Sequence, residues 1–203
     1  MLAISHGAHA LGFVSDTLTG AGAIGDDEIQ SIVAATPPTF STVLLTSEED
    51  PAAVVRHQRK TRSNTLQLVG PIRPEGLREL RDALPGIALI KVIHVEDAAS
   101  IDVALSYSDV ADALLLDTRV KVGDREELGG TGVIHDWSIS RQIVETSRLP
   151  VFLAGGLSPE NVTEGIRRVS PFGVDVCSSL RPHGHLEPDR LRDFVANATG
   201  TLR

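Results

Sequence analysis

Short apolar runs rich in Val, Leu and Ile recur along the chain and alternate with longer segments of helical period. The runs are continuously apolar, which is typical of parallel strands whose outer face is covered. They predict strands at 9–15, 42–46, 65–69, 89–95, 113–117, 151–154 and 174–177. The segments between them predict helices near 26–35, 51–62, 74–83, 97–107, 138–147, 159–168 and 188–197. This alternation, without a break in composition, predicts a single α/β domain over residues 1–203.

The number of predicted strands is one short of the eight that close a (β/α) barrel. Residues 1–8 read as the tail of a helix that ends at Gly7. The predicted fold is therefore a TIM-type (β/α) barrel that lacks its first strand, which is expected before Met1. The edge strands, at 9–15 and 174–177, would expose unpaired backbone groups that invite another chain. We expect the chain to form a homodimer through this gap or to close the gap by distorting the barrel.

Small residues follow the last two predicted strands. Gly155 and Gly156 end one strand, and their N–H groups can approach an oxyanion because no Cβ stands in the way. Ser178 and Ser179 end the other strand. Barrels of this type often bind a phosphate at this place. The four residues predict a phosphate site, and the alternative for each pair alone is a tight turn or a helix cap.

Two further strand ends carry candidate catalytic groups. Asp117 ends an apolar strand, and the active sites of barrels lie at the carboxyl ends of their strands. A carboxylate at an apolar rim can have a raised pKa, which suits a general acid. His94 lies near another strand end and is the second catalytic candidate. The alternative roles are a loop cap for Asp117 and a structural histidine for His94. Cys177 is predicted to be buried inside the last strand.

A glycine-rich segment, 129–132, predicts a loop that can fold over a substrate. Its residues Gly130 and Thr131, together with Gln67, are the predicted substrate-binding residues. His183 and His185 are spaced by one residue, but without a matching carboxylate–His pattern they read as solvated loop histidines rather than metal ligands.

Composition and charge narrow the range of partners. The formal net charge is −8, the basic residues are scattered and aromatic residues make up 3%, which argues against a nucleic-acid partner. No apolar run approaches the ~20 residues of a membrane span. The single cysteine fits a reducing compartment, so the chain is read as cytoplasmic. A small phosphorylated metabolite remains a suitable partner, because backbone N–H groups and helix N-termini can bind it.

Several runs occur in the order and at the spacing of one known family. They are Leu66–Gly70, Leu115–Thr118, Gly129–Gly132, His135–Trp137, Leu153–Leu157 and Gly173–Val176, and Ala8–Val14 is similar to that family's second strand. The chain thus resembles phosphoribosylanthranilate isomerase over nearly its whole length. The resemblance implies isomerisation of an aminated ribose phosphate in tryptophan biosynthesis, with no metal or organic cofactor. It also implies that Asp117 protonates the furanose ring oxygen and that the Gly155, Gly156, Ser178 and Ser179 set holds the phosphate.

The chain departs from that family at positions that bear on its chemistry. The family's general base is a cysteine at the end of the first strand, whereas the single cysteine here is Cys177. The family's arginine for the anthranilate carboxylate has no counterpart in Ser15–Ala23, and Val69 replaces a histidine. Three functions are left open: a phosphoribosylanthranilate isomerase, a divergent homologue that acts on another phosphosugar, and a non-catalytic barrel that binds a phosphorylated ligand.

Overall fold

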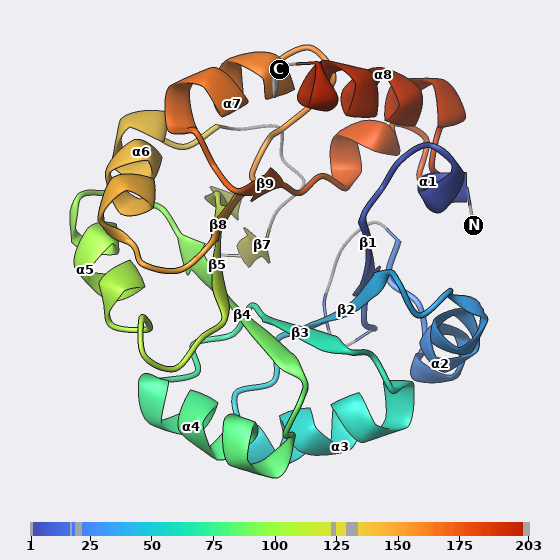
Figure 1. Cartoon of the computed structure of the whole chain (residues 1–203), viewed down its shortest axis with the longest axis vertical. Coiled ribbons are helices and arrows are strands. Elements are labelled where there is room, and N and C mark those ends of the chain that lie inside the picture. Colours follow the sequence, from blue (N-terminus) through green and yellow to red (C-terminus); the bar gives the residue numbers. More distant parts are fainter. Residues whose placement is uncertain (1, 17, 19–21, 123–124, 129–133, 201–203) are drawn as a thin grey trace.

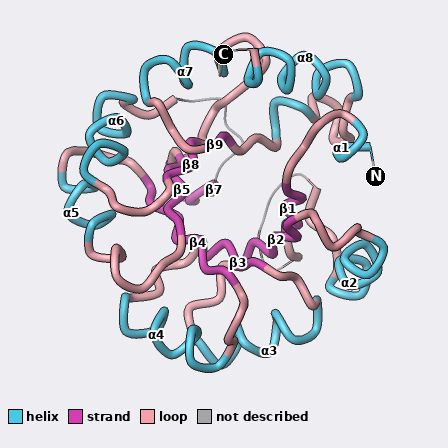
Figure 2. Tube along the Cα trace, viewed as in Figure 1, coloured by secondary structure: helices cyan, strands magenta, loops and turns pink. Residues whose placement is uncertain are grey.

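The chain forms a curled sheet of seven parallel strands with helices around it (Figure 1). The structure, a computed structural model, describes residues 2–16, 18, 22–122, 125–128 and 134–200. In spatial order the strands are β1 (Ala10–Val14), β2 (Ser41–Thr46), β3 (Thr65–Leu68), β4 (Ala88–His94), β5 (Ala113–Asp117), β8 (Val151–Leu153) and β9 (Gly173–Val174). The helices are α1 (Leu2–Ser5), α2 (Asp26–Ala35), α3 (Pro51–Thr61), α4 (Pro74–Ala83), α5 (Ala99–Leu105), α6 (Trp137–Thr146), α7 (Val162–Val169) and α8 (Pro188–Thr199), with a short 3₁₀ helix η1 (Ser178–Leu180). Strands lie inside and helices outside (Figure 2), which confirms the predicted TIM-type architecture.

The sheet has an open side between its first and last strands. In the part of the chain that the structure describes, the sheet pairs β1 with β2 alone and β9 with β8 alone. The prediction of seven strands with two edges is therefore confirmed. Near the strand ends this side is partly covered, because Ile24 forms an isolated bridge with Ser15. A Cβ placed on Gly22 would also lie 3.5 Å from Cζ of Arg181, so the segments that follow β1 and β9 meet there.

The last strand is shorter than predicted. β9 ends at Val174, and Cys177 begins the turn into η1 with φ −133° and ψ −74°. Cys177 is exposed, so its predicted burial inside a strand is wrong. The physical reason is that, among the described strands, β9 forms ladder hydrogen bonds with β8 alone. Few backbone hydrogen bonds therefore keep the chain extended beyond Asp175.

An antiparallel hairpin, β6 (Arg119–Val122) and β7 (Arg125–Leu128), follows β5 and was not predicted. Residues 124–127 are all charged, so this part of the segment carries no apolar run that would predict a strand. Valines at 120 and 122 alternate with basic residues, and this period of two is the local signal for a strand.

The core has an outer and an inner layer because side chains alternate across each strand. The outer layer joins the sheet to the helices and includes the fully buried Leu114, Leu116 and Leu153. The inner layer is small and consists of Val92, Leu115 and Ala154, with Val69, Ile90 and Phe152 packed against it. Burial of one large aliphatic side chain contributes about 1.5–3 kcal/mol, so the outer layer supplies most of the hydrophobic stabilisation.

The helices form the outer layer around the sheet (Figure 1). Asp50 caps α3 by accepting hydrogen bonds from the N–H groups of Ala52 and Ala53, both at 3.2 Å. Helices α1 and α8 lie side by side near the open side of the sheet (Figure 1), where a Cβ on Gly7 would be 3.2 Å from Cγ1 of Val195. Among the described residues, no helix has the length and apolar character needed to cross a membrane.

Candidate functional site

The two predicted catalytic residues lie side by side at the carboxyl ends of neighbouring strands. His94 of β4 is the register partner of Asp117 of β5. The N–H of Thr118 donates to Oδ1 of Asp117 at 2.7 Å, which fixes the carboxyl group at the strand end. Burial, and to a smaller extent the charge of Asp175, raise the pKa of Asp117 to about 6, against the hydrogen bond from the Thr118 N–H, which lowers it. Asp117 can therefore hold a proton close to neutral pH, as a general acid must.

A buried histidine supports the strand end that carries Asp117. Nδ1 of His135 is 2.9 Å from Oγ1 of Thr118, and its Nε2 is 2.6 Å from Oγ of Ser140 in α6. Burial lowers the pKa of His135 to about 4, so the imidazole is neutral at physiological pH. His135 thus anchors the residue next to the acid to a helix. Sequence reasoning noted His135 only within a motif and assigned it no role.

Gly155 and Gly156 both adopt the left-handed backbone conformation, with φ +78° and +67°. A Cβ on Gly155 would lie 2.6 Å from the backbone N of Thr118 and 3.0 Å from Oδ1 of Asp117, and would also overlap the Thr118 hydroxyl. The loop after β8 therefore packs directly against the end of β5. Glycine is required at position 155 both for its backbone conformation and for this close approach.

The four predicted phosphate-binding residues lie in two segments that touch. The hydroxyl of Ser179 donates to the carbonyl of Leu157 at 2.6 Å, which joins η1 to the loop after β8. Nδ2 of Asn161 donates to the carbonyl of Gly156 at 2.9 Å, so this carbonyl is turned toward Asn161. Because its hydroxyl is already engaged, Ser179 could offer an anion its backbone N–H, while Ser178 could offer its hydroxyl. The structure thus brings η1 against the loop after β8, and the phosphate site between them remains a prediction.

The predicted substrate-binding residues are only partly described. Gln67 is buried in β3, in register with Ile90 of the inner layer, so its side chain faces the interior of the barrel. Gly130 and Thr131 lie outside the described residues, and their predicted role remains a prediction.

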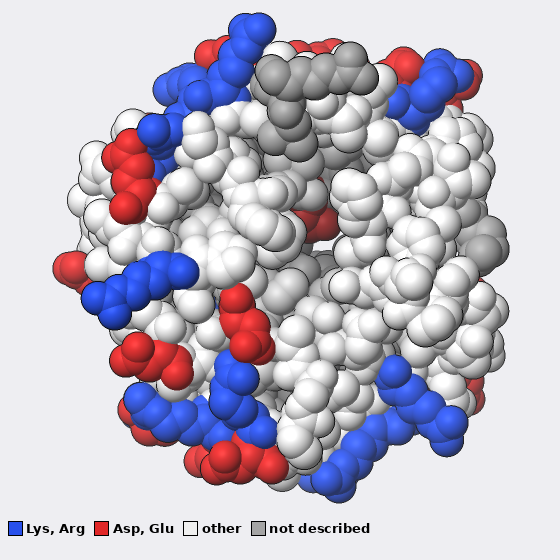
Figure 3. All heavy atoms as spheres, in the orientation of Figure 1, with Lys and Arg blue, Asp and Glu red and all other residues white. Residues whose placement is uncertain are grey.

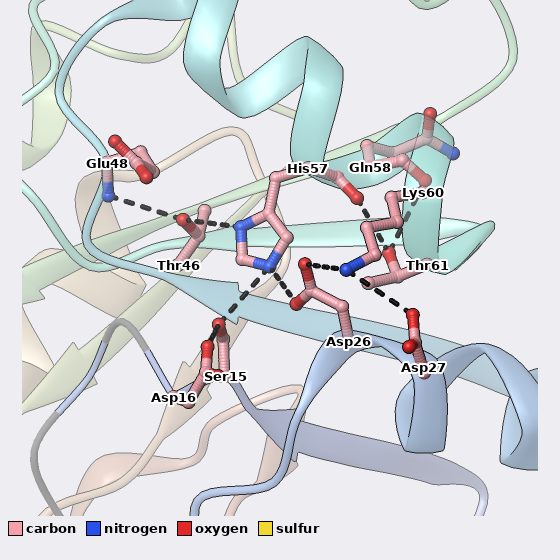
Figure 4. Close-up of polar contacts among 10 residues, drawn as sticks. All are labelled: Ser15, Asp16, Asp26, Asp27, Thr46, Glu48, His57, Gln58, Lys60 and Thr61. Atoms are coloured by element: carbon pink, nitrogen blue, oxygen red, sulfur yellow. Dashed lines mark hydrogen bonds and ion pairs between the residues drawn. The ribbon is translucent and has the colours of Figure 1, made fainter.

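A second polar cluster lies behind the ends of β1 and β2 (Figure 4). Nε2 of His57 is 3.2 Å from Oγ of Ser15 and 2.9 Å from Oδ1 of Asp26, while its Nδ1 is 3.3 Å from Oγ1 of Thr46. A serine-protease-like relay needs the serine and the carboxylate on opposite ring nitrogens, whereas here both meet Nε2. Ser15 is also fully buried. The cluster therefore joins β1, β2, α2 and α3 and is structural.

Charged side chains lie mainly around the periphery of the face shown in Figure 3, and an acidic side chain is visible in the hollow at its centre. Within the described ranges, no group of three or more His, Cys, Asp or Glu side chains could hold a metal ion. The ring centroids of His183 and His185 are 6.4 Å apart, and both residues are exposed.

Parallel strands, an outer ring of helices and polar groups at the carboxyl ends of the strands define a (β/α)-barrel protein. The chain belongs to the family described as N-(5'phosphoribosyl)anthranilate (PRA) isomerase, whose family model matches residues 2–197. This confirms the resemblance read from the sequence. The enzymes of the family are aldose–ketose isomerases of tryptophan biosynthesis.

Individual relatives agree with this assignment. The chain is 40% identical over 190 residues to the N-(5'-phosphoribosyl)anthranilate isomerase of Methanocella arvoryzae, an alignment that covers 93% of this chain and 87% of the relative. A crystal structure of a phosphoribosyl anthranilate isomerase in complex with reduced 1-(o-carboxyphenylamino)-1-deoxyribulose 5-phosphate has a TM-score of 0.81 at 28% identity, covering 98% of this chain and 91% of that one. A structure of mutually generated monomers of the dimeric Thermotoga maritima enzyme has a TM-score of 0.81 at 26% identity, with the same 98% and 91% coverage.

Proposed function

We propose that this chain isomerises N-(5'-phosphoribosyl)anthranilate to 1-(o-carboxyphenylamino)-1-deoxyribulose 5-phosphate, with Asp117 as the general acid. The observation that carries this assignment is the Asp117 carboxyl group itself. It lies at the end of β5, its pKa is raised to about 6, and the Thr118 N–H and the Gly155 backbone fix its position. A proton donor of this kind is what opening of a furanose ring requires.

The reaction begins when Asp117 gives its proton to the ring oxygen. The C1–O bond breaks, and the lone pair of the anthranilate nitrogen forms a C1=N iminium. A base then removes the proton from C2, and the electrons of the C2–H bond form a C1=C2 double bond while the iminium π pair returns to nitrogen. Ketonisation moves one proton to C1 and removes one from the hydroxyl on C2. The substrate carbon C1 is thereby reduced and C2 oxidised, with no external redox partner.

The phosphate group of the substrate would bind between the loop after β8 and the start of η1. Gly155 and Gly156 present backbone without a Cβ, and Ser178 and Ser179 add N–H groups and one hydroxyl. Binding the remote phosphate supplies energy that positions the ribose C1 and C2 atoms at the strand ends. A relative's crystal structure that holds a deoxyribulose 5-phosphate derivative supports this choice of ligand.

The remaining predicted residues have proposed roles around the same site. His94, in register with Asp117, would face the ring that Asp117 opens. Gln67 would contact the substrate from inside the barrel, and Gly130 and Thr131 would cover it. We also propose a homodimer, which the dimeric Thermotoga maritima relative supports, and a cytoplasmic location, which the single cysteine supports.

The activity is tested by incubating the chain with N-(5'-phosphoribosyl)anthranilate and separating the product by chromatography. Turnover is expected, and Asp117→Asn should reduce kcat by ~10²–10⁴ because the amide cannot give up a proton to the ring oxygen. Absence of turnover by the unaltered chain contradicts the proposed substrate. Equal turnover by Asp117→Asn contradicts the proposed acid.

The phosphate site is tested by thermal protection with inorganic phosphate. Gly156→Asp should abolish protection because it adds bulk and negative charge where the anion must approach. Gly86→Asp is the matched control: Gly86 also has a left-handed conformation (φ +87°) but precedes β4, and a Cβ placed on it would have no atom within 4 Å. Equal protection of the two variants would show that the phosphate binds elsewhere.

A further inference from the structure

The position of the Asp117 carboxyl group depends on Thr118, the residue after it. The ladder of β5 ends at Asp117, so the sheet does not hold Thr118 as it holds the strand. Two other contacts fix this buried residue. The backbone of Gly155 packs against its hydroxyl, and Nδ1 of His135 is 2.9 Å from its Oγ1. Its N–H, held in this way, donates to Oδ1 of Asp117 at 2.7 Å.

His135 is itself fixed by the start of α6. Its Nε2 is 2.6 Å from Oγ of Ser140, which is fully buried. The next residue, Asp136, caps α6 by accepting a hydrogen bond from the N–H of Ser138 at 2.8 Å. Because the ring of His135 has a buried hydroxyl partner at each nitrogen, it has one orientation. The position of Thr118 is thereby tied to a helix.

The bond from Thr118 also distinguishes the two oxygens of the Asp117 carboxyl group. An oxygen that accepts an N–H hydrogen bond is less basic than one that accepts none, because the bond stabilises its negative charge. Oδ1 accepts the bond from Thr118. The proton of the neutral acid is therefore on Oδ2, and a change in the Thr118 N–H removes this preference.

We infer that His135 is a positioning residue for the acid: its Nδ1 holds Thr118 so that the Thr118 N–H stays on Oδ1 of Asp117 and the proton stays on Oδ2. This role rests on the proposed isomerase function, in which Oδ2 gives that proton to the ring oxygen. The imidazole transfers no proton itself, because both of its nitrogens are engaged by hydroxyl groups.

Two substitutions of His135 separate the contacts of its two nitrogens. The side-chain amide of asparagine reaches the place of Nδ1, and that of glutamine reaches the place of Nε2. An amide both donates and accepts, so it suits either hydroxyl. His135→Gln keeps Ser140 but loses Thr118, and should lower kcat by ~10²-fold with KM changed only a few-fold. His135→Asn keeps Thr118 and should recover most of that activity. Each variant loses one buried hydrogen bond, so their melting temperatures should be similar.

The titration of Asp117 gives a readout that does not need turnover. The Thr118 N–H lowers the pKa of Asp117, so loss of this bond should raise that pKa above about 6. Carbon-13 NMR of the carboxyl group should show the rise in His135→Gln and in Thr118→Val, but not in His135→Asn. The fall in kcat with rising pH should move to higher pH in the same two variants, because the acid must be protonated. His94 and Asp175, the titratable groups that flank Asp117 by register and by charge, are the same in all of them.

His57→Gln is the matched control. His57 is also buried, and its Nδ1 is 3.3 Å from Oγ1 of Thr46, the last residue of β2 (Figure 4). This variant loses the same kind of contact at a different strand end. It should lower the melting temperature and leave both kcat and the titration of Asp117 unchanged.

The outcomes separate the positioning role from the proposed function. If the unaltered chain turns over and the two His135 variants have the same kcat and the same Asp117 titration, the positioning role is wrong while the isomerase function stands. The role is also wrong if His57→Gln changes these quantities as much as His135→Gln does. If the unaltered chain does not turn over, the proposed substrate is wrong, and the NMR titration alone decides whether His135 holds the carboxyl group through Thr118.

Discussion

Replacing Gly155 by alanine measures how tightly the loop after β8 supports the acid. At φ +78° an alanine costs about 1–2 kcal/mol relative to its preferred conformations. Its Cβ would also lie 2.6 Å from the N of Thr118 and 3.0 Å from Oδ1 of Asp117. Overpacking of this kind costs roughly 1–3 kcal/mol. Together these effects predict a loss of about 2–5 kcal/mol in the free energy of unfolding.

Gly86→Ala separates the two effects, because Gly86 has φ +87° and nothing within 4 Å of its Cβ position. For a chain of this size, 1 kcal/mol shifts Tm by roughly 2–4 °C. Calorimetry should therefore show Gly155→Ala melting about 2–12 °C below Gly86→Ala, from the crowding alone. Turnover by Gly155→Ala should fall by roughly 10²-fold, since displacing Thr118 moves the Asp117 carboxyl group. A Gly155→Ala chain that melts at the same temperature as Gly86→Ala would refute the packing argument.

Asp117→Asn should reduce kcat by ~10²–10⁴ and yet raise stability at pH 8 by about 1–3 kcal/mol, because it removes a buried charge. The pKa of Asp117 is raised to about 6 in the folded chain, so the ionised carboxylate lowers the free energy of unfolding above that pH. This effect disappears as the pH falls below 4, where the carboxyl group is protonated in both states. Melting curves at pH 8 and pH 4 should therefore show the stability gain of Asp117→Asn only at pH 8. His57→Leu should lower the free energy of unfolding by about 1–3 kcal/mol in a urea titration, because Thr46 and Asp26 lose a buried hydrogen-bond partner. Arg56→Leu, at an exposed position of the same helix α3, is the control and should have little effect. Light scattering should show a homodimer at micromolar concentration, because β1 and β9 each have an edge that no other described strand pairs with. A stable monomer would show that the segments around Gly22 and Arg181 protect those edges well enough.

The strands could be predicted from the sequence because each one is a continuous apolar run between polar segments. A strand covered on both faces needs apolar side chains on both, and Ala113–Leu116 shows this directly. The hairpin β6–β7 and the early end of β9 could not be predicted in the same way. The hairpin pairs within a separate two-stranded sheet, and among the described residues β9 pairs with β8 alone, so local pairing rather than an apolar run decides where these strands begin and end.

The acid and the phosphate loops were predictable for a different reason. In a parallel barrel every strand ends on the same face, so a polar or small residue just after an apolar run is placed near the others by topology alone. Asp117, Gly155 and Ser178 follow from that rule. The support from His135 could not be predicted, because it depends on a 2.9 Å contact with Thr118 across 17 residues of chain.

Asp175 shows where the rule about strand ends is insufficient. The residues near the end of β9 follow one another in the sequence, so their position alone does not tell which of them reaches the site. The alternation of side chains along the extended chain does. The valines at 174 and 176 face the helices, so the one carboxylate between them must face the interior. That pattern is visible in the sequence, but it identifies the row shared with Asp117 only when the register through Ala154 is known. Strand ends therefore predict which residues gather at the site, whereas register determines which of them share a row of the sheet.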